Sequence, residues 1–279
     1  MANFVQNSYD FAPAAGLPGQ HARFKPGQYL ATVIALAAMT PGLVAFNGRA
    51  VGGAAGEAGH MTAPAASATG ILASGGASSA SSQTISGASL NGTYGNGAEL
   101  LPPRNVTLVL SSSADWDATT ATVTGTDENG AALTESIAIP NGGNATVVGA
   151  SAFRTVTSIA IPAQSGTGGT FTVGIGSVFG SVDHLVEGLV ARDITRSAVA
   201  FAAGELVPVM RNADAFVTSE SAVKEGDPVF VRVRAPSGET IGAVRATPVA
   251  GETVRLKNAR FTSTNSAGLS RIDLNLPAG

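Results

Sequence analysis

The sequence predicts an all-β protein, and three features of its composition point that way. Glycine contributes 35 of the 279 residues, which suits tight turns because glycine adopts positive φ without steric cost. Charged residues make up only 13% of the chain, too few for the outer faces of long solvent-exposed helices. Hydrophobic residues still reach 44%, enough for a core, and the many Val and Thr residues fit a pleated surface. The length allows one large domain or two ordinary ones.

Charge and cysteine content exclude several function classes. A net charge of −3 and a pI near 5.6 argue against a nucleic-acid binder, which needs a basic footprint. The chain has no Cys, and therefore no disulfide, thiolate metal site or cysteine nucleophile. The apolar run over residues 29–46 is broken by Pro41-Gly42 and is too short to cross a bilayer. It also follows a polar segment, unlike a signal peptide, so we expect no nucleic-acid partner, no membrane segment and no export signal.

Residues 1–28 are expected to form an extended N-terminal arm, because no helical or strand periodicity persists there. This arm carries four aromatic residues, Phe4, Tyr9, Phe11 and Phe24. The segment has no evident core of its own, so these rings suit docking on a neighbouring molecule, where aromatic anchors supply contact energy. They are the candidate interface residues. The alternative is that the arm folds back on its own domain.

The next two segments differ sharply in composition. Residues 29–52 are expected to contain a buried strand pair that turns at Thr40-Pro41-Gly42. Residues 53–99 then consist largely of Gly, Ala, Ser and Thr. Such a sequence does not bury enough apolar area to offset its ordering entropy. We therefore predict a flexible linker at 53–99 and a domain boundary there.

Residues 100–182 show the pattern of a small β-sandwich. Asn129-Gly130 and Asn141-Gly142 are strong hairpin signals between alternating segments. Six short strands at this spacing suggest a sandwich, with Trp116 expected in its core. The expected strands are 105–110, 119–126, 133–139, 145–148, 153–161 and 170–175.

The final part, residues 183–279, is again predicted to be β. Val229, Val231 and Val233 alternate with larger or charged residues, which indicates one buried face. Phe230, Arg232 and Arg234 are expected on the opposite, decorated face. The expected strands are 185–191, 206–210, 215–218, 229–234, 253–256, 259–262 and 269–274.

Motifs for chemistry are missing from the sequence. His21, His60 and His184 are far apart and form no metal-binding pair at helical spacing. Asp127-Glu128-Asn129-Gly130 begins like a calcium loop but has no closing Glu at the required spacing, so turn chemistry explains it. No nucleophile elbow, dinucleotide fingerprint or phosphate loop is present. We expect no catalytic, cofactor-binding or metal-binding residues, and no enzyme.

Four motifs, in order along the chain, resemble those of the capsid cement (head-decoration) proteins of tailed bacteriophages. The opening strand and turn, Ala38-Met39-Thr40-Pro41-Gly42-Leu43-Val44, comes first, followed by Gly188-Leu189-Val190-Ala191-Arg192-Asp193. Gly226-Asp227-Pro228-Val229-Phe230-Val231-Arg232 is similar to a recurring Gly-Asp-x-Val-x-x-Arg strand entry. A closing hairpin follows at 259–263 and 272–276.

The resemblance implies a capsid-binding β-barrel or β-sandwich domain that is discontinuous, built from 29–52 plus 183–279. Residues 100–182 would then be an inserted domain, which resembles the immunoglobulin-like modules of phage surface proteins through Ala121 to Asp127 and Phe153-Arg154-Thr155-Val156. The family likeness further implies a homotrimer, made in the host cytoplasm, that clamps major capsid proteins on the outer surface of the virion. Whether the insert contacts a host surface or glycans stays open. The alternatives are a phage tail or fibre component, and a surface adhesin or carbohydrate-binding module.

Overall fold

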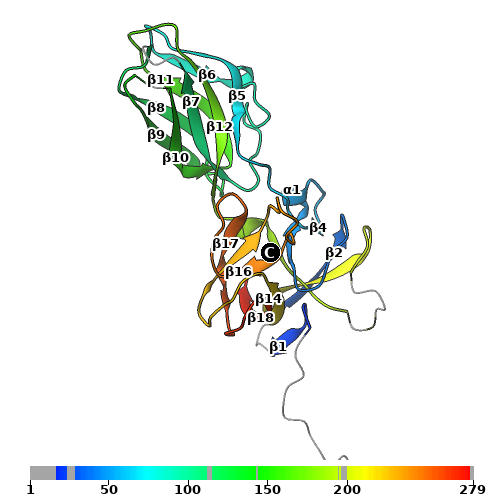
Figure 1. Cartoon of the computed structure of the whole chain (residues 1–279). Helices are drawn as coiled ribbons and strands as arrows, with labels where there is room; N and C mark the ends of the chain where they lie inside the picture. Colours follow the sequence, from blue (N-terminus) through cyan, green and yellow to red (C-terminus); the bar gives the residue numbers. More distant parts are fainter. Residues whose placement is uncertain are drawn as a thin grey trace, which may run out of the picture.

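The computed structural model describes residues 17–23, 29–111, 115–142, 144–193, 195 and 200–276. The protein has two lobes, a sandwich lobe and a barrel lobe, and both are built almost entirely of strands (Figure 1). This confirms the all-β prediction. The strand β1 lies at the end of the barrel lobe that points away from the sandwich (Figure 1).

The sandwich lobe consists of two four-stranded sheets that share one hydrophobic core. The sheet orders are β10-β7-β12-β5 and β6-β11-β8-β9, and neighbouring strands are antiparallel. The elements are β5 (Ser67–Ala77), β6 (Gln83–Ser86), η1 (Gly87–Ser89), β7 (Arg104–Ser111), β8 (Thr119–Thr126), β9 (Ala132–Ile139), β10 (Ala145–Phe153), β11 (Thr155–Ile161) and β12 (Thr170–Phe179).

Trp116 lies in the sandwich core, as the sequence predicts. Its side chain is only 1% exposed, and its ring meets Phe171 edge-on with centroids 5.8 Å apart. The indole Nε1 donates a hydrogen bond of 2.9 Å to the Ser111 carbonyl. The ring therefore fills the core while its single polar atom is satisfied, as buried Trp requires.

The prediction of a flexible linker over residues 53–99 is wrong where β5 and β6 form. β5 pairs with β12, and β6 pairs with β11, so each adds an edge strand to one sheet of the sandwich. Ile71 and Leu72 of β5 are fully buried. An edge strand needs few large side chains of its own, because the neighbouring strand supplies hydrogen bonds and the facing sheet supplies most of the core.

The barrel lobe is a ten-stranded sheet that closes into two rings, and both rings contain β14. One ring runs β14-β16-β15-β17-β18 and closes through the β14–β18 pairing. The other runs β14-β2-β4-β3-β13 and closes through β13–β14. The elements are β1 (His21–Arg23), β2 (Tyr29–Ala35), β3 (Val44–Asn47), α1 (Gly48–Val51), β4 (Glu57–Gly59), η3 (Asp183–Leu185), β13 (Val186–Val190), β14 (Leu206–Ser219), β15 (Pro228–Arg232), β16 (Val244–Arg245), β17 (Thr253–Phe261) and β18 (Gly268–Asn275).

Two hydrophobic clusters form the core of the barrel lobe. Val229, Val231 and Ile272 belong to the larger cluster, with β14 contributing Ala213, Ala215 and Val217. A smaller cluster includes Val33 and Ala35 of β2 with Val207 and Val209 of β14. Odd-numbered residues of β14 thus join the smaller cluster in its first half and the larger cluster in its second half.

Two expectations about strand pairing in the barrel lobe are wrong. The strands on either side of Thr40-Pro41-Gly42, β2 and β3, are not neighbours, because β4 lies between them. The turn is held from outside instead, with the Gly42 amide donating to the Val190 carbonyl at 2.9 Å. The segments expected at 206–210 and 215–218 form the single strand β14, since continuous pairing with β18 carries the strand through Asn212 and Asp214.

The two lobes are fastened where the chain crosses between them. Arg104, at the start of β7, is fully buried, and its Nη1 donates to the Pro64 and Ala65 carbonyls at 2.8 and 3.3 Å. Its guanidinium also lies 4.8 Å from the centroid of the Phe179 ring. Burial lowers the pKa of Arg104 to about 10, so the group is charged at neutral pH. Arg104 therefore ties both crossing segments together.

Further contacts surround this crossing. Glu99 of the sandwich lobe accepts hydrogen bonds from Arg154 of the same lobe and from Arg49 of α1 in the barrel lobe. The Gly251 amide donates to the Ser177 carbonyl of β12 at 2.8 Å, and Lys257 Nζ of β17 lies 3.7 Å from Glu128 Oε1 of the sandwich. The sandwich is thus held against the barrel by side-chain and backbone bonds rather than by a loose tether.

Replacing Arg104 by Ala is expected to weaken the junction. The loss of two hydrogen bonds from a charged donor, together with the contact to Phe179, should lower the free energy of unfolding by about 3 kcal/mol. Small-angle X-ray scattering should show a broader distribution of intramolecular distances. Arg255→Ala, at an exposed position on β17, is the matched control. An Arg104→Ala profile that superimposes on the wild type would show that the junction does not depend on this side chain.

Stability is expected to fall as the pH drops below about 6.5, the ordinary pKa of His. Burial lowers the pKa of His60, whose Nδ1 lies 2.9 Å from the Val44 carbonyl and whose Nε2 is buried with no described partner. The unfolded chain therefore binds a proton at a pH where folded His60 does not. This favours unfolding below that pH and has no effect above it.

The matched variant for this effect is His60→Gln, followed by denaturant unfolding at several pH values. It should flatten the acid slope but not abolish it, because burial also lowers the pKa of His184. Identical slopes for wild type and variant would contradict the assignment to His60.

Candidate interaction surface

The outer side of the β2–β14 pair is an exposed apolar face, which we define as Leu30, Thr32, Ile34, Leu206 and Pro208. Leu30, Ile34 and Leu206 are 52%, 42% and 67% exposed. Leu206 lies opposite Ile34, and Pro208 opposite Thr32, in the antiparallel register. Scattered apolar residues are ordinary on protein surfaces, but a cluster on two paired strands marks an interaction site.

A groove of about 600 Å³ adjoins this apolar face. Its lining combines apolar side chains with polar and charged ones. The lining residues are Gly19, Gln20, Leu30, Ala191, Arg192, Asp193 and Pro208. Leu30 and Pro208 belong to both the groove and the apolar face, so the two form one continuous surface.

One wall of the groove is built by the residues that precede β1. The Gly19 amide donates to the Phe216 carbonyl, and the Arg192 amide donates to the Gly19 carbonyl, both at 2.9 Å. Gly19 has φ of 81°, and a Cβ there would lie 2.7 Å from the Pro41 side chain. Gly42 has the same φ, and its Cβ would lie 2.4 Å from the Pro18 side chain. The Thr-Pro-Gly turn therefore packs directly against Pro18-Gly19, which requires glycine at both positions.

The predicted capsid-interface residues Phe4, Tyr9, Phe11 and Phe24 lie outside the described residues, so their role stays a prediction. Within residues 1–28, the described part 17–23 packs on its own barrel, with β1 paired to β14. For that part, the alternative of a segment folded back on its own domain is correct.

The sequence analysis missed the apolar face. The signal was the alternation in β2, where exposed Leu30, Thr32 and Ile34 are interleaved with more buried residues. This alternation did not reveal the exposed side of β2, because the interleaved Ala31, Val33 and Ala35 are apolar as well. Apolar character alone does not reveal which side of such a strand faces solvent.

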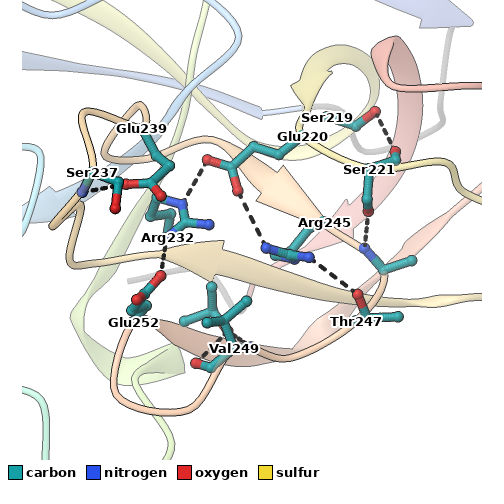
Figure 2. A network of polar contacts seen from close by, with 12 residues as sticks. Ser219, Glu220, Ser221, Arg232, Ser237, Glu239, Arg245, Thr247, Val249 and Glu252 are labelled. Atoms are coloured by element: carbon teal, nitrogen blue, oxygen red, sulfur yellow. Dashed lines mark hydrogen bonds and ion pairs between the residues drawn. The ribbon is translucent and has the colours of Figure 1, made fainter.

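An ion-pair network in the barrel lobe joins Arg232 and Arg245 to Glu220 and Glu252 (Figure 2). Arg232 donates through Nε to Glu220 at 2.6 Å and through Nη1 to Glu252 at 2.5 Å. Arg245 approaches the other Glu220 oxygen at 3.8 Å. Arg232 is only 3% exposed, so the prediction that it lies on the exposed face of its strand is wrong. Its charge is balanced inside the protein by carboxylates that are distant in sequence.

Each residue of the Gly-Asp-x-Val-x-x-Arg motif has a structural role in the barrel. Gly226 has φ of 91°, a conformation that favours glycine. Asp227 accepts a hydrogen bond from the Lys224 amide at 2.8 Å, which fixes the turn. Val229 enters the core, and Arg232 forms the ion pairs. The motif is therefore a folding signature of the barrel rather than a binding site.

The histidine and acidic motifs remain apart. Among the described residues, no group of three or more His, Asp or Glu side chains could hold a metal ion. The Asp127 carboxylate accepts from the Asn129 and Ala131 amides at 2.8 and 2.9 Å, as a turn requires. In the part of the chain that the structure describes, no helix is both long and apolar enough to span a membrane.

Replacing Arg232 by Ala is expected to destabilise the protein strongly. Removal of one partner leaves Glu220 and Glu252 near each other without a cation, which typically costs about 3–5 kcal/mol. Arg232→Met, which keeps the volume, should lose nearly as much for the same reason. Both losses can be measured by denaturant unfolding against Arg255→Ala, expected within about 0.5 kcal/mol of the wild type. A loss below about 1 kcal/mol for both Arg232 variants would contradict this role.

Comparison with known proteins gives one match. The family model described as "Structural cement protein (E217 gp24/Pam3 gp6)" matches residues 123–275, from within β8 of the sandwich to the end of β18. None of the curated proteins matches the chain. Because the matched residues make up more than half of the sequence, the chain belongs to this family of phage structural cement proteins.

Proposed function

We propose that this protein binds the outside of a phage head and stabilises contacts between major capsid proteins, without catalysing a reaction. Membership of a structural cement family supports the role. The single structural observation that carries the proposal is the apolar face on β2 and β14, with Leu206 67% exposed. It lies on the lobe that contains the family's Gly-Asp-x-Val-x-x-Arg motif, and it gives the barrel lobe a surface suited to burial against the shell.

The size of this face argues for several contacts acting together. Full burial of one Leu or Ile side chain contributes about 1.5–3 kcal/mol, and association costs at least about 4 kcal/mol in lost translational and rotational freedom. Three such side chains give only modest affinity for a single site. A homotrimer that engages several capsid subunits at once would convert this modest affinity into stable attachment. Preferential binding to the assembled lattice would then stabilise the shell by mass action.

The rival functions have less support. Carbohydrate-binding modules commonly stack sugars on exposed aromatic rings, whereas Trp116, Phe153 and Phe171 of the sandwich are buried and Tyr94 and Phe179 are partly buried. A tail or fibre location would share the family's structural character but not its cement role. Contact of the sandwich with a host surface or glycans, and its immunoglobulin-like nature, stay predictions.

Leu206→Asp and Ile34→Asp are expected to abolish or strongly weaken decoration of heads. A carboxylate at either position would be buried without a partner in the complex, while the free protein keeps it in water. Co-sedimentation with purified heads that lack this protein measures binding, and thermal unfolding checks the fold. Val148→Asp is the matched control, because Val148 is 60% exposed on the sandwich lobe.

The expected result is wild-type decoration by Val148→Asp and little by the two barrel variants, with similar melting temperatures for all three. Normal decoration by both barrel variants would rule out the apolar face as the contact surface. A reconstruction of the whole phage particle is the second, independent experiment. Density on tails alone would overturn the cement role itself.

A further inference from the structure

We propose that the groove beside the apolar face binds the Tyr9-Asp10-Phe11 segment of a second copy of this chain. The inference extends the proposed function, since exchanged segments would link neighbouring copies on a shell. The exchange itself needs no capsid. It follows from the chemistry of the groove, the composition of the N-terminal segment and the position at which the described chain begins.

The groove offers an apolar floor with one available cation. Arg192 is partly exposed at the rim, and within the described residues its guanidinium makes no ion pair or hydrogen bond. The carboxylate next to it is already engaged, because Asp193 Oδ1 accepts from the Thr195 amide at 2.9 Å and from its hydroxyl at 2.6 Å. An arginine beside an apolar pocket is a common anchor at protein interfaces. The fitting ligand is a carboxylate flanked by large apolar side chains.

The N-terminal sequence contains one such ligand. Asp10 is the sole Asp, Glu, Lys or Arg in residues 1–22, and it stands between Tyr9 and Phe11. In an extended segment, side chains two residues apart point the same way. Tyr9 and Phe11 would therefore lie together on the floor formed by Leu30 and Pro208, and Asp10 would remain within reach of the long Arg192 side chain.

The position of the described chain favours a neighbouring copy over the same chain. Gly19 and Gln20 line the groove, and their backbone is fixed by hydrogen bonds to Phe216. Only residues 12–16 separate Phe11 from Leu17, and self-docking would require them to reverse direction within that length. Pro13 and Pro18 disfavour this, because proline holds the preceding residue extended.

Exchange of this kind is head-to-tail, since the segment of one copy meets the groove of the next. Head-to-tail interfaces close into a ring when the rotation between copies permits it. The segment would thereby supply the adhesion between copies, while the adjoining apolar face stays available to the capsid.

The test uses the natural absence of Cys. Two single variants, Asp10→Cys and Arg192→Cys, are purified separately, mixed and oxidised under mild conditions. Segment exchange predicts a disulfide-linked dimer on a non-reducing gel that needs both variants in the mixture. Asp10→Cys mixed with Arg255→Cys, at an exposed position on β17 outside the groove, is the control and should give little product.

The double variant Asp10→Cys/Arg192→Cys separates the remaining outcomes. Cross-linked oligomers support exchange, whereas a disulfide confined to monomers would show that the segment occupies its own groove and would overturn the second-copy proposal. The absence of any 10–192 cross-link would overturn the groove as its binding site. Charge reversal gives an independent readout by sedimentation velocity. Asp10→Arg and Arg192→Asp should each weaken self-association roughly tenfold or more, and the pair together should restore it.

These outcomes are distinct from failure of the capsid-binding proposal. Loss of decoration by Leu206→Asp with intact cross-linking would support both assignments separately. Intact decoration by that variant, with cross-linking retained, would remove the apolar face from the cement role and leave the exchange standing.

Discussion

The hydrogen bonding of β14 is the constraint on which the barrel lobe depends. This strand of 14 residues pairs with β2 and β13 in its first half and with β1 and β18 in its second. Both rings close on it, so neither can form without it. Val207 and Val209 face one cluster, whereas Ala213, Ala215 and Val217 face the other, so the core of each ring also depends on the register of this strand. The groove and the apolar face both lie along its first half.

The junction at Arg104 and Glu99 changes how the sandwich should be regarded. A domain inserted through a flexible linker would be free to move relative to the barrel. Instead, the sandwich is bonded to the barrel at several points. The family match also begins at residue 123, inside the sandwich, and runs on to residue 275. Sandwich strands β9 to β12 and barrel strands β13 to β18 therefore fall within one matched unit, and a passenger role for the sandwich has little support.

Local patterns predicted most strands but not the contacts between distant ones. Alternation and the Asn129-Gly130 turn placed β8 and β9 closely, because they form a hairpin determined by residues near each other in sequence. Asn141-Gly142 was misleading as a hairpin signal, since it joins β9 to β10 in the other sheet. β5 was missed because its small residues suggest disorder, and its order comes from β12, about a hundred residues later. Burial of Arg232 was unpredictable for the same reason, since Glu220 and Glu252 approach it only in the folded barrel. Ring closure through β14 leaves no local signal at all.

Closure also decides how this protein can recognise a partner. An open sheet can bind another chain by adding a strand to its edge, but both rings of the described barrel return to β14 and leave no long free edge. Recognition by this lobe must then use side chains on strand faces or grooves between segments. Leu30, Ile34 and Leu206 meet the first condition, and the groove beside Arg192 meets the second. The barrel buries most of its apolar side chains but leaves these exposed. This is what we expect of a fold that binds through strand faces rather than strand edges.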